Sequence, residues 1–365
     1  YTAPSGFKAL NTANLPTPTI VKPSTVMDVK LYTGNGSTQT ISGLGFSPDL
    51  VWIKCRSTGS LSNILQDTVR GVNKTLFSDL TDGESTANYL TSFNSDGFGV
   101  DGTTFNPTNQ NGQTYVGWTW DAGSSTVTNT QGSISSQVRA NASAGFSIVT
   151  YTGNGGASTI GHGLGVAPSL IIIKSRSSTD GWPVYHASVG NTAFLYLNQT
   201  SASVTNSAAW NNTSPTSSVF TVGFGTLMNT NGNNHVAYCF APVAGYSAFG
   251  SYTGNGSADG PFVYTGFRPR YIMVKSSSIG GSSGYDWIIH DTARSAYNLS
   301  DTQLIANSSV VENQDSGGAS TAGFGWDILS NGFKIRTSTG GRNQSGQTYI
   351  YAAFAESPFQ YARAR

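Results

Sequence analysis

Tyr-Thr-Gly-Asn-Gly occupies residues 32–36, and the same five residues recur at 151–155 and 252–256. After each copy come a Gly-rich turn, a proline and a four-residue apolar run that ends in lysine. The distance from the tyrosine to that lysine is the same in all three copies to within one residue. Three such matches do not arise by chance, and a fixed internal period identifies one structural unit used repeatedly. The sequence therefore predicts three homologous units.

The apolar runs predict buried strands. Four apolar residues between turn signals are typical of a strand covered on both faces, whereas a helix needs a longer periodic stretch. The lysines that close the runs, Lys54, Lys174 and Lys275, are interpreted as solvated strand ends or as residues that guard the strand against aggregation. A catalytic role for them is not expected.

A second shared strand closes each copy at residues 114–120, 234–240 and 348–354. Side chains of a strand alternate between its two faces, which places Trp118 and Trp120 on the same face in the first copy. The second copy repeats this pattern. The face is predicted to belong to a hydrophobic core.

The Asn-Gly pairs predict tight turns. Asn-Gly between strand-like flanks favours a type I′ hairpin, because both central residues of that turn need a positive φ. A Gly-rich phosphate-binding loop would need a following helix, and the sequence shows no such helix. We therefore expect the pentapeptide to form the turn of an opening hairpin.

Composition favours an all-β protein. The chain has 44 glycines and 12% aromatic residues among 365, as short strands joined by tight turns require. This length suits two to four domains. We expect three tandem homologous antiparallel β-sandwich domains of jelly-roll or lectin-like type.

The repeats also predict the domain boundaries. The expected segments are an extended N-terminal segment or linker at 1–25, sandwiches at 26–125, 146–245 and 246–359, a linker or extra hairpin at 126–145, and a C-terminal tail at 360–365.

The charge balance argues against two classes of partner. Lys and Arg number 19 against 18 Asp and Glu, and 10% of residues are charged. No basic field is expected that would bind nucleic acid or a membrane surface, and no apolar run is long enough to insert in a bilayer. Cys55 and Cys239 lie at different points of their units, which excludes a disulfide shared by the repeats. A single disulfide between two domains remains an alternative.

The sequence shows no catalytic or metal-binding pattern. Its four histidines are not at metal-ligand spacing, and no nucleophile elbow or carboxylate pair is evident. We therefore expect no catalytic residue, no metal site, no cofactor and no enzyme activity. Asp67 and Arg70, like Asp291 and Arg294, are expected to form loop-stabilising ion pairs of small effect if exposed.

Aromatic residues beside small polar ones are the candidate ligand-binding residues, since exposed rings stack on sugars or on partner surfaces. Core packing is the expected role for most of these residues, and the shared repeat position of Trp182 and Trp287 favours it. The candidates are Trp182, Tyr185, His186, Trp210, Tyr285, Trp287 and His290.

Several motifs resemble those of a known family. The pentapeptide, the run 161–168, and the segments 182–186 and 208–213 resemble a repeat domain of virion structural and tail-fibre-like proteins of marine bacteriophages. The resemblance covers residues 26–359, and the second copy carries it best. Residues 1–12 are similar to the last strand of a SPRY-like domain, which suggests that a further N-terminal region precedes this chain.

The resemblance implies a function but assigns no site residues. A protein of this kind is expected on the virion surface as part of a tail or head fibre. It would bind a host cell-surface glycan or protein through exposed loops, contact other virion proteins and form a homo-oligomer, a trimer by analogy. The alternatives are a purely structural capsid-decoration or extracellular filament subunit and a glycan-degrading tailspike.

Overall fold

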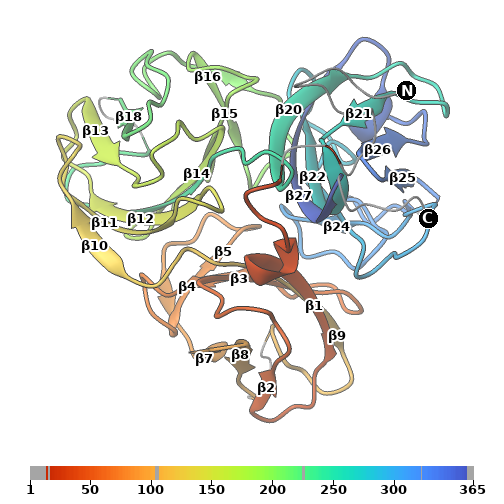
Figure 1. The fold of residues 1–365 in the computed structure, drawn as a ribbon, viewed down its shortest axis with the longest axis horizontal. Helices are drawn as coiled ribbons and strands as arrows, with labels where there is room; N and C mark the ends of the chain where they lie inside the picture. Colours follow the sequence, from red (N-terminus) through yellow and green to blue (C-terminus); the bar gives the residue numbers. More distant parts are fainter. Residues whose placement is uncertain (1–13, 15–16, 103–106, 224–226, 322, 360–365) are drawn as a thin grey trace.

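The computed structural model describes residue 14 and residues 17–102, 107–223, 227–321 and 323–359. The predicted tail at 360–365 and the SPRY-like segment at 1–12 lie outside the described residues. The all-β prediction is confirmed: antiparallel strands build the described chain, and its one α-helix, α1 (Gly340–Asn343), has four residues. Figure 1 shows three lobes arranged around a common centre.

The first lobe comprises η2 (Pro23–Thr25), β1 (Met27–Thr33), β2 (Gln39–Ile41), β3 (Leu50–Cys55), β4 (Ile64–Asp67), β5 (Lys74–Phe77), β6 (Ser85–Thr86), β7 (Leu90–Asn94), β8 (Gly97–Val100) and β9 (Thr114–Trp120). The second comprises β10 (Thr126–Asn129), β11 (Ser136–Asn141), β12 (Phe146–Thr152), β13 (Ser158–Gly161), β14 (Leu170–Ser175), β15 (Pro183–His186), β16 (Ala193–Tyr196), β17 (Val204–Thr205), β18 (Val219–Val222) and β19 (Asn234–Phe240). The third comprises β20 (Ser247–Thr253), β21 (Phe262–Tyr264), β22 (Phe267–Ser276), β23 (Ile288–Asp291), β24 (Leu304–Ile305), β25 (Trp326–Leu329), β26 (Gly332–Ile335), α1 and β27 (Thr348–Pro358).

Each lobe holds one larger and one smaller antiparallel sheet. The larger sheets run β1-β9-β3-β4-β5-β6, β10-β11-β12-β19-β14-β15-β16-β17 and β20-β27-β22-β23-β24. The smaller ones are β2-β8-β7, β13-β18 and β21-β26-β25. The stretch 126–145, predicted as a linker or an extra hairpin, contains the hairpin β10–β11. This hairpin extends the larger sheet of the second lobe.

The predicted apolar runs form the centre of each larger sheet. In every lobe the apolar strand pairs with the closing strand in one register, with Leu50 opposite Trp120, Leu170 opposite Phe240, and Tyr271 opposite Phe354. Strands β3 and β14 are buried along their whole length. The apolar run 271–274 of β22 is buried as well, so the prediction of strands covered on both faces is confirmed for all three runs.

The pentapeptide is not a hairpin turn, so that expectation is wrong. Strand β1 pairs with β9, whereas β2 pairs with β8 in the other sheet, and the motif carries the chain between the two sheets. In the first copy only the last glycine, Gly36, has a positive φ, of 69°. Asn35 instead accepts the backbone N–H of Ser37 through its side chain, as asparagine does in turns.

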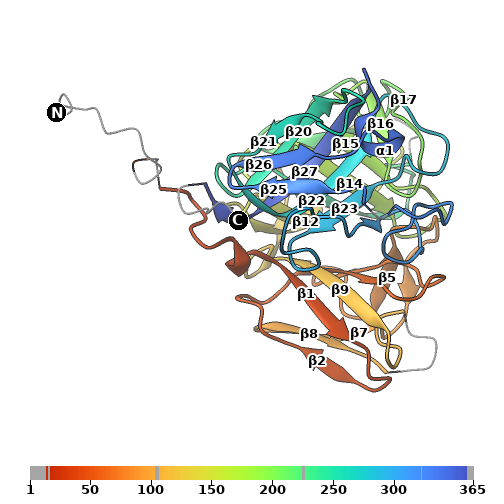
Figure 2. The same ribbon diagram turned by 90° about the vertical axis from the view of Figure 1, so that its right-hand side faces the viewer.

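The two faces of a larger sheet serve two different cores. In the first lobe Val51 and Ile53 face the smaller sheet, whereas Trp52, Trp118 and Trp120 belong to a cluster that extends through all three lobes. The face predicted to be core is therefore buried, but against the other lobes. Figure 2 shows the first lobe lying beneath the other two, with β1 and β9 below their sheets.

The strand-end lysines are buried, contrary to the expectation that they are solvated. Each one crosses to a neighbouring lobe: Lys54 donates to the carbonyl of Ser308, Lys174 to that of Thr81, and Lys275 to that of Thr200. The chain thus closes a ring in which each lobe contacts both others. An ammonium group buried in this way needs such acceptors to offset its lost hydration.

The two cysteines and the Asp67–Arg70 ion pair are more deeply buried than the sequence indicates. Cys55 and Cys239 are both free and buried, so no disulfide joins the lobes. Asp67 pairs with Arg70 as expected, but both side chains are fully buried. Tyr238 of the second lobe donates its hydroxyl to Asp67, so the pair stabilises a contact between lobes. None of the described helices is long and apolar enough to span a membrane.

Candidate functional site

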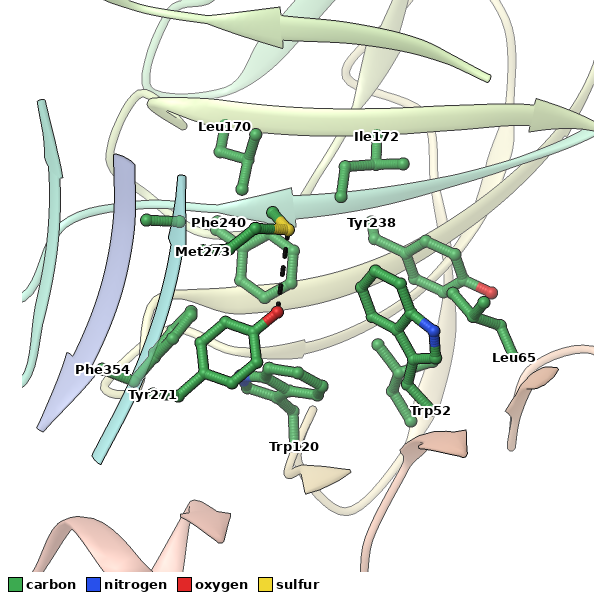
Figure 3. Close-up of a pocket in the computed structure, with 12 residues that line it drawn as sticks. Trp52, Leu65, Trp120, Leu170, Ile172, Tyr238, Phe240, Tyr271, Met273 and Phe354 are labelled. Atoms are coloured by element: carbon green, nitrogen blue, oxygen red, sulfur yellow. Dashed lines mark hydrogen bonds between the residues drawn. The ribbon is translucent and has the colours of Figure 1, made fainter. Parts of the chain in front are cut away.

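A small cavity lies where the three lobes meet. Its lining is apolar, with aromatic and aliphatic side chains from all three lobes pointing inward (Figure 3). Trp120 lies 6.1 Å from Phe240 and 5.7 Å from Phe354 between ring centroids. The cavity measures about 20 Å³, which is room for little more than a single water. It is a packing defect of the central core, not a ligand site.

Six of the seven candidate ligand-binding residues are buried, as core packing requires, and they are therefore not available as exposed contacts. Trp182 donates its indole N–H to the carbonyls of Phe77 and Leu80 in the first lobe. Trp287 makes the equivalent bond to Tyr196 in the second lobe. These two tryptophans occupy interfaces between lobes.

The other buried candidates also have structural partners. Tyr185 packs edge-on against Trp210 at 5.5 Å inside the second lobe. His186 donates from Nε2 to the carbonyl of Tyr351 in the third lobe. His290 stacks on Trp326 at 4.3 Å, inside the third lobe. The structure therefore does not bring these candidates together into one site.

Tyr285, the seventh candidate, is half-buried and lines a hollow in the third lobe. We call this hollow the third-lobe pocket. Its volume is about 310 Å³, at the small end of the range for ligand sites. Loops before β23, before β25 and around α1 form it. The side chains that matter for its chemistry are Tyr285, Asp315, Thr321, Phe324 and Arg342.

Two glycines keep the loops of the pocket close together. A Cβ on Gly341 would lie 1.7 Å from the carbonyl oxygen of Gly284, so no other residue fits there without a backbone shift. Gly284 itself has a φ of 91°, which disfavours other residues. The pocket wall is therefore built by direct approach of two backbone segments.

Arg342 supplies the positive charge of the pocket. It is 3% exposed, and its guanidinium carbon lies 5.3 Å from the centre of the Phe324 ring. Burial lowers the pKa of Arg342 to about 10, while Tyr252, Asp286 and Asp315 act in the opposite direction. The group remains charged at neutral pH.

Of the remaining polar groups in the pocket, some have hydrogen-bond partners within the protein and others do not. Asp286 is buried, and its carboxylate accepts from Asn307, Gly284 and Ser316, so it shapes the loops. Asp315 uses Oδ1 for two backbone N–H groups of its own turn. The Thr321 hydroxyl is buried with no partner. The pocket thus presents a cation, a carboxylate oxygen, a hydroxyl and two rings.

A family description, "Domain of unknown function (DUF7483)", matches residues 22–358. The chain belongs to the DUF7483 family. No curated protein and no solved structure matches it. The family match spans all three lobes, so the DUF7483 domain corresponds to the whole ring and not to one lobe.

Sequence reasoning missed most of the pocket in this DUF7483 chain. Arg342 stands three residues before the closing Ser345-Gly346 turn, where the other copies have Thr108 and Met228. That substitution, together with the longer third copy, was a signal that the third lobe differs. Among the described residues no cluster of histidine, cysteine or acidic side chains is arranged to hold a metal ion.

Proposed function

We propose that this chain is a structural protein of a bacteriophage virion appendage, a tail or head fibre, and that its third lobe binds a host-surface glycan. In this proposal the lobes are jelly-roll or lectin-like β-sandwiches without enzyme activity. The chain forms a homo-oligomer, a trimer by analogy, at the virion surface. The motif resemblance supports the viral setting, and the third-lobe pocket supports the binding role.

The single observation that carries the binding role is the composition of the pocket. Ligand sites combine apolar rings with a few convergent polar groups. Tyr285 offers a partly exposed ring, and the carboxylate of Asp315 offers an acceptor for hydroxyl groups. Buried Thr321 and Arg342 add donors within the same hollow. A sugar ring, apolar on its faces and polar at its edge, matches this set.

A glycan array and intact host cells test the proposal. The full chain should bind saturably, and Tyr285→Ala should weaken binding at least about tenfold. Tyr297→Ala is the matched control, because Tyr297 is 77% exposed and lies outside the pocket. Absence of binding, or equal binding by the two variants, would contradict the proposal.

A second candidate function is the purely structural one, and one surface favours it. Phe262 and Tyr264 are 45% and 61% exposed on β21, which is an edge strand of its sheet. Exposed apolar edges are typical of contacts between chains. A second copy of this chain would cover this strand. Phe262→Ser with Tyr264→Ser should then lower the oligomeric state measured by analytical ultracentrifugation.

A further inference from the structure

Arg342 is a charged residue at a position that the fold fills elsewhere with uncharged ones. In each lobe the pentapeptide tyrosine donates its hydroxyl to the carbonyl of one residue before the closing turn. Those residues are Thr108, Met228 and Arg342, and all three are buried. The backbone role is thus the same in all lobes, and it does not require a guanidinium. The charge in the third lobe needs another explanation.

Arg342 has no ion-pair partner among the residues that the structure describes. Its Nε is buried without a hydrogen-bond partner, and no described carboxylate forms an ion pair with the guanidinium. Buried arginines elsewhere in this chain are paired: Arg70 with Asp67, and Arg294 with Asp291. A buried charge is costly unless it is paired and hydrogen-bonded. An unpaired one that lines a cavity indicates that its partner comes from outside the protein.

We infer that the third-lobe pocket binds a carboxylate-bearing sugar, with the carboxylate on the Arg342 guanidinium. This inference rests on the proposed glycan-binding function and specifies its ligand class. The planar fork of arginine matches the two oxygens of a carboxylate. The sugar hydroxyls then face the free oxygen of Asp315 and the unpartnered hydroxyl of Thr321.

Asp315 favours a singly charged ligand. Its side chain shares the pocket with Arg342, so the two opposite charges leave the pocket no net positive charge to offset the lost hydration of a dianion. A phosphate ester carries nearly two negative charges at neutral pH, and it is disfavoured for that reason. A uronic acid carries one charge and several hydroxyl donors. The presence of both Arg342 and Asp315 in the pocket therefore favours an acidic sugar over a phosphate.

Calorimetry with matched glycosides tests the inference on the full chain. Methyl β-D-glucuronide and methyl β-D-glucoside differ at a single carbon, which bears the carboxylate in the former. The glucuronide should bind at least about tenfold more tightly. N-acetylneuraminic acid, measured in parallel, distinguishes a nonulosonic acid from a uronic acid as the preferred source of the carboxylate.

Arg342→Met is the decisive variant, because Met228 occupies the equivalent position in the second lobe. It should abolish the preference for the acidic sugar, and Arg342→Lys should weaken it by removing the fork while keeping the charge. Arg336→Met is the control, since Arg336 is exposed and outside the pocket. Thermal unfolding checks that each variant folds.

The outcomes separate the inference from the proposed function. Equal binding of the two glycosides, or acidic-sugar binding that survives Arg342→Met, overturns the inference and leaves glycan binding intact. Absence of binding to every sugar, including those of the array, overturns both. A phosphorylated sugar that binds more tightly than the glucuronide also overturns the choice of carboxylate.

Discussion

Lys54, Lys174 and Lys275 are three ammonium groups that the fold buries between lobes. Burial lowers the pKa of the first two to about 8 and that of Lys275 to about 7. Nearby Asp79, Asp180 and Asp286 oppose this shift without cancelling it. Each lysine therefore makes the folded state release a proton more readily than the unfolded state does.

The free energy of unfolding is predicted to rise between about pH 7 and pH 9. In this window the unfolded lysines, with an ordinary pKa near 10.5, stay protonated while the buried ones lose protons. The unfolded state binds more protons, so stability increases with pH. Above this window the raised pKa of Cys239 acts in the opposite direction. Urea unfolding at pH 7, 8 and 9 measures the slope.

Lys275→Met tests the cause of that slope. The variant removes the buried lysine with the lowest pKa of the three, so it should flatten the rise relative to the parent chain. Lys22→Met is the control at an exposed position. A slope that is unchanged by Lys275→Met would contradict the assignment to buried lysines.

The sequence does not show the burial of these lysines, because their acceptors lie far away along the chain. The carbonyl that Lys54 meets belongs to Ser308, 254 residues later. A charged strand end is solvated by default, and only the neighbouring lobe changes that. The unusual position of Arg342, in contrast, can be found from the sequence, because an alignment of the three copies places it opposite Thr108 and Met228.

At the scale of elements, an asparagine clamp joins the pentapeptide to the turn before each closing strand. In the second lobe Asn229 accepts the backbone N–H of Asn154 through Oδ1, and its Nδ2 donates to the carbonyl of Gly156. The first and third lobes repeat this arrangement with Asn109 and Asn343. The clamp holds the crossover between the two sheets.

Asn229→Ala is predicted to destabilise the chain by about 1–2 kcal/mol, because it removes the side-chain partners of two partly buried backbone hydrogen bonds. Urea unfolding at fixed pH measures this change. Asn231→Ala is the control, since Asn231 is exposed in the adjacent turn, and surface changes stay within about 0.5 kcal/mol. Equal effects of the two substitutions would show that the clamp contributes no stability.

Strand positions were predictable, but strand partners were not. The alternation over β9 identifies a buried face correctly, because Trp118 and Trp120 are buried. Both faces of β3 are apolar, however, as Val51 and Trp52 show. Periodicity then cannot tell which face meets the smaller sheet and which meets another lobe. The pentapeptide was misassigned for a related reason: an Asn-Gly signal is local, whereas the choice of sheet is not.

At the scale of the whole molecule, the three lobes share one central core. Aromatic rings from each closing strand meet there, with Trp120, Phe240 and Phe354 in mutual contact. Ion pairs also join the lobes. Arg176 of the second lobe binds Glu84 of the first, and Arg56 of the first lobe binds Glu312 of the third. The third interface uses Ser203 and Ser277 instead. Such continuous packing couples the unfolding of the lobes.

Trp120→Ala is predicted to destabilise all three lobes together by about 3–5 kcal/mol, the usual cost of removing a buried aromatic ring. Unfolding followed by tryptophan fluorescence and by far-ultraviolet circular dichroism should give coincident single transitions before and after the substitution. Two separated transitions would mean that the lobes unfold independently. Tyr297→Ala should leave the midpoint unchanged, because that ring is exposed.

We propose that the shared all-β ring carries a glycan-binding pocket in its third lobe. Hydrogen exchange of the full chain, with and without an acidic host polysaccharide, tests this claim directly. Protection is predicted in the loops at 277–285, 313–321 and 336–342, with little change in the first and second lobes. Equal protection in all three lobes, or protection confined to β21, would contradict it.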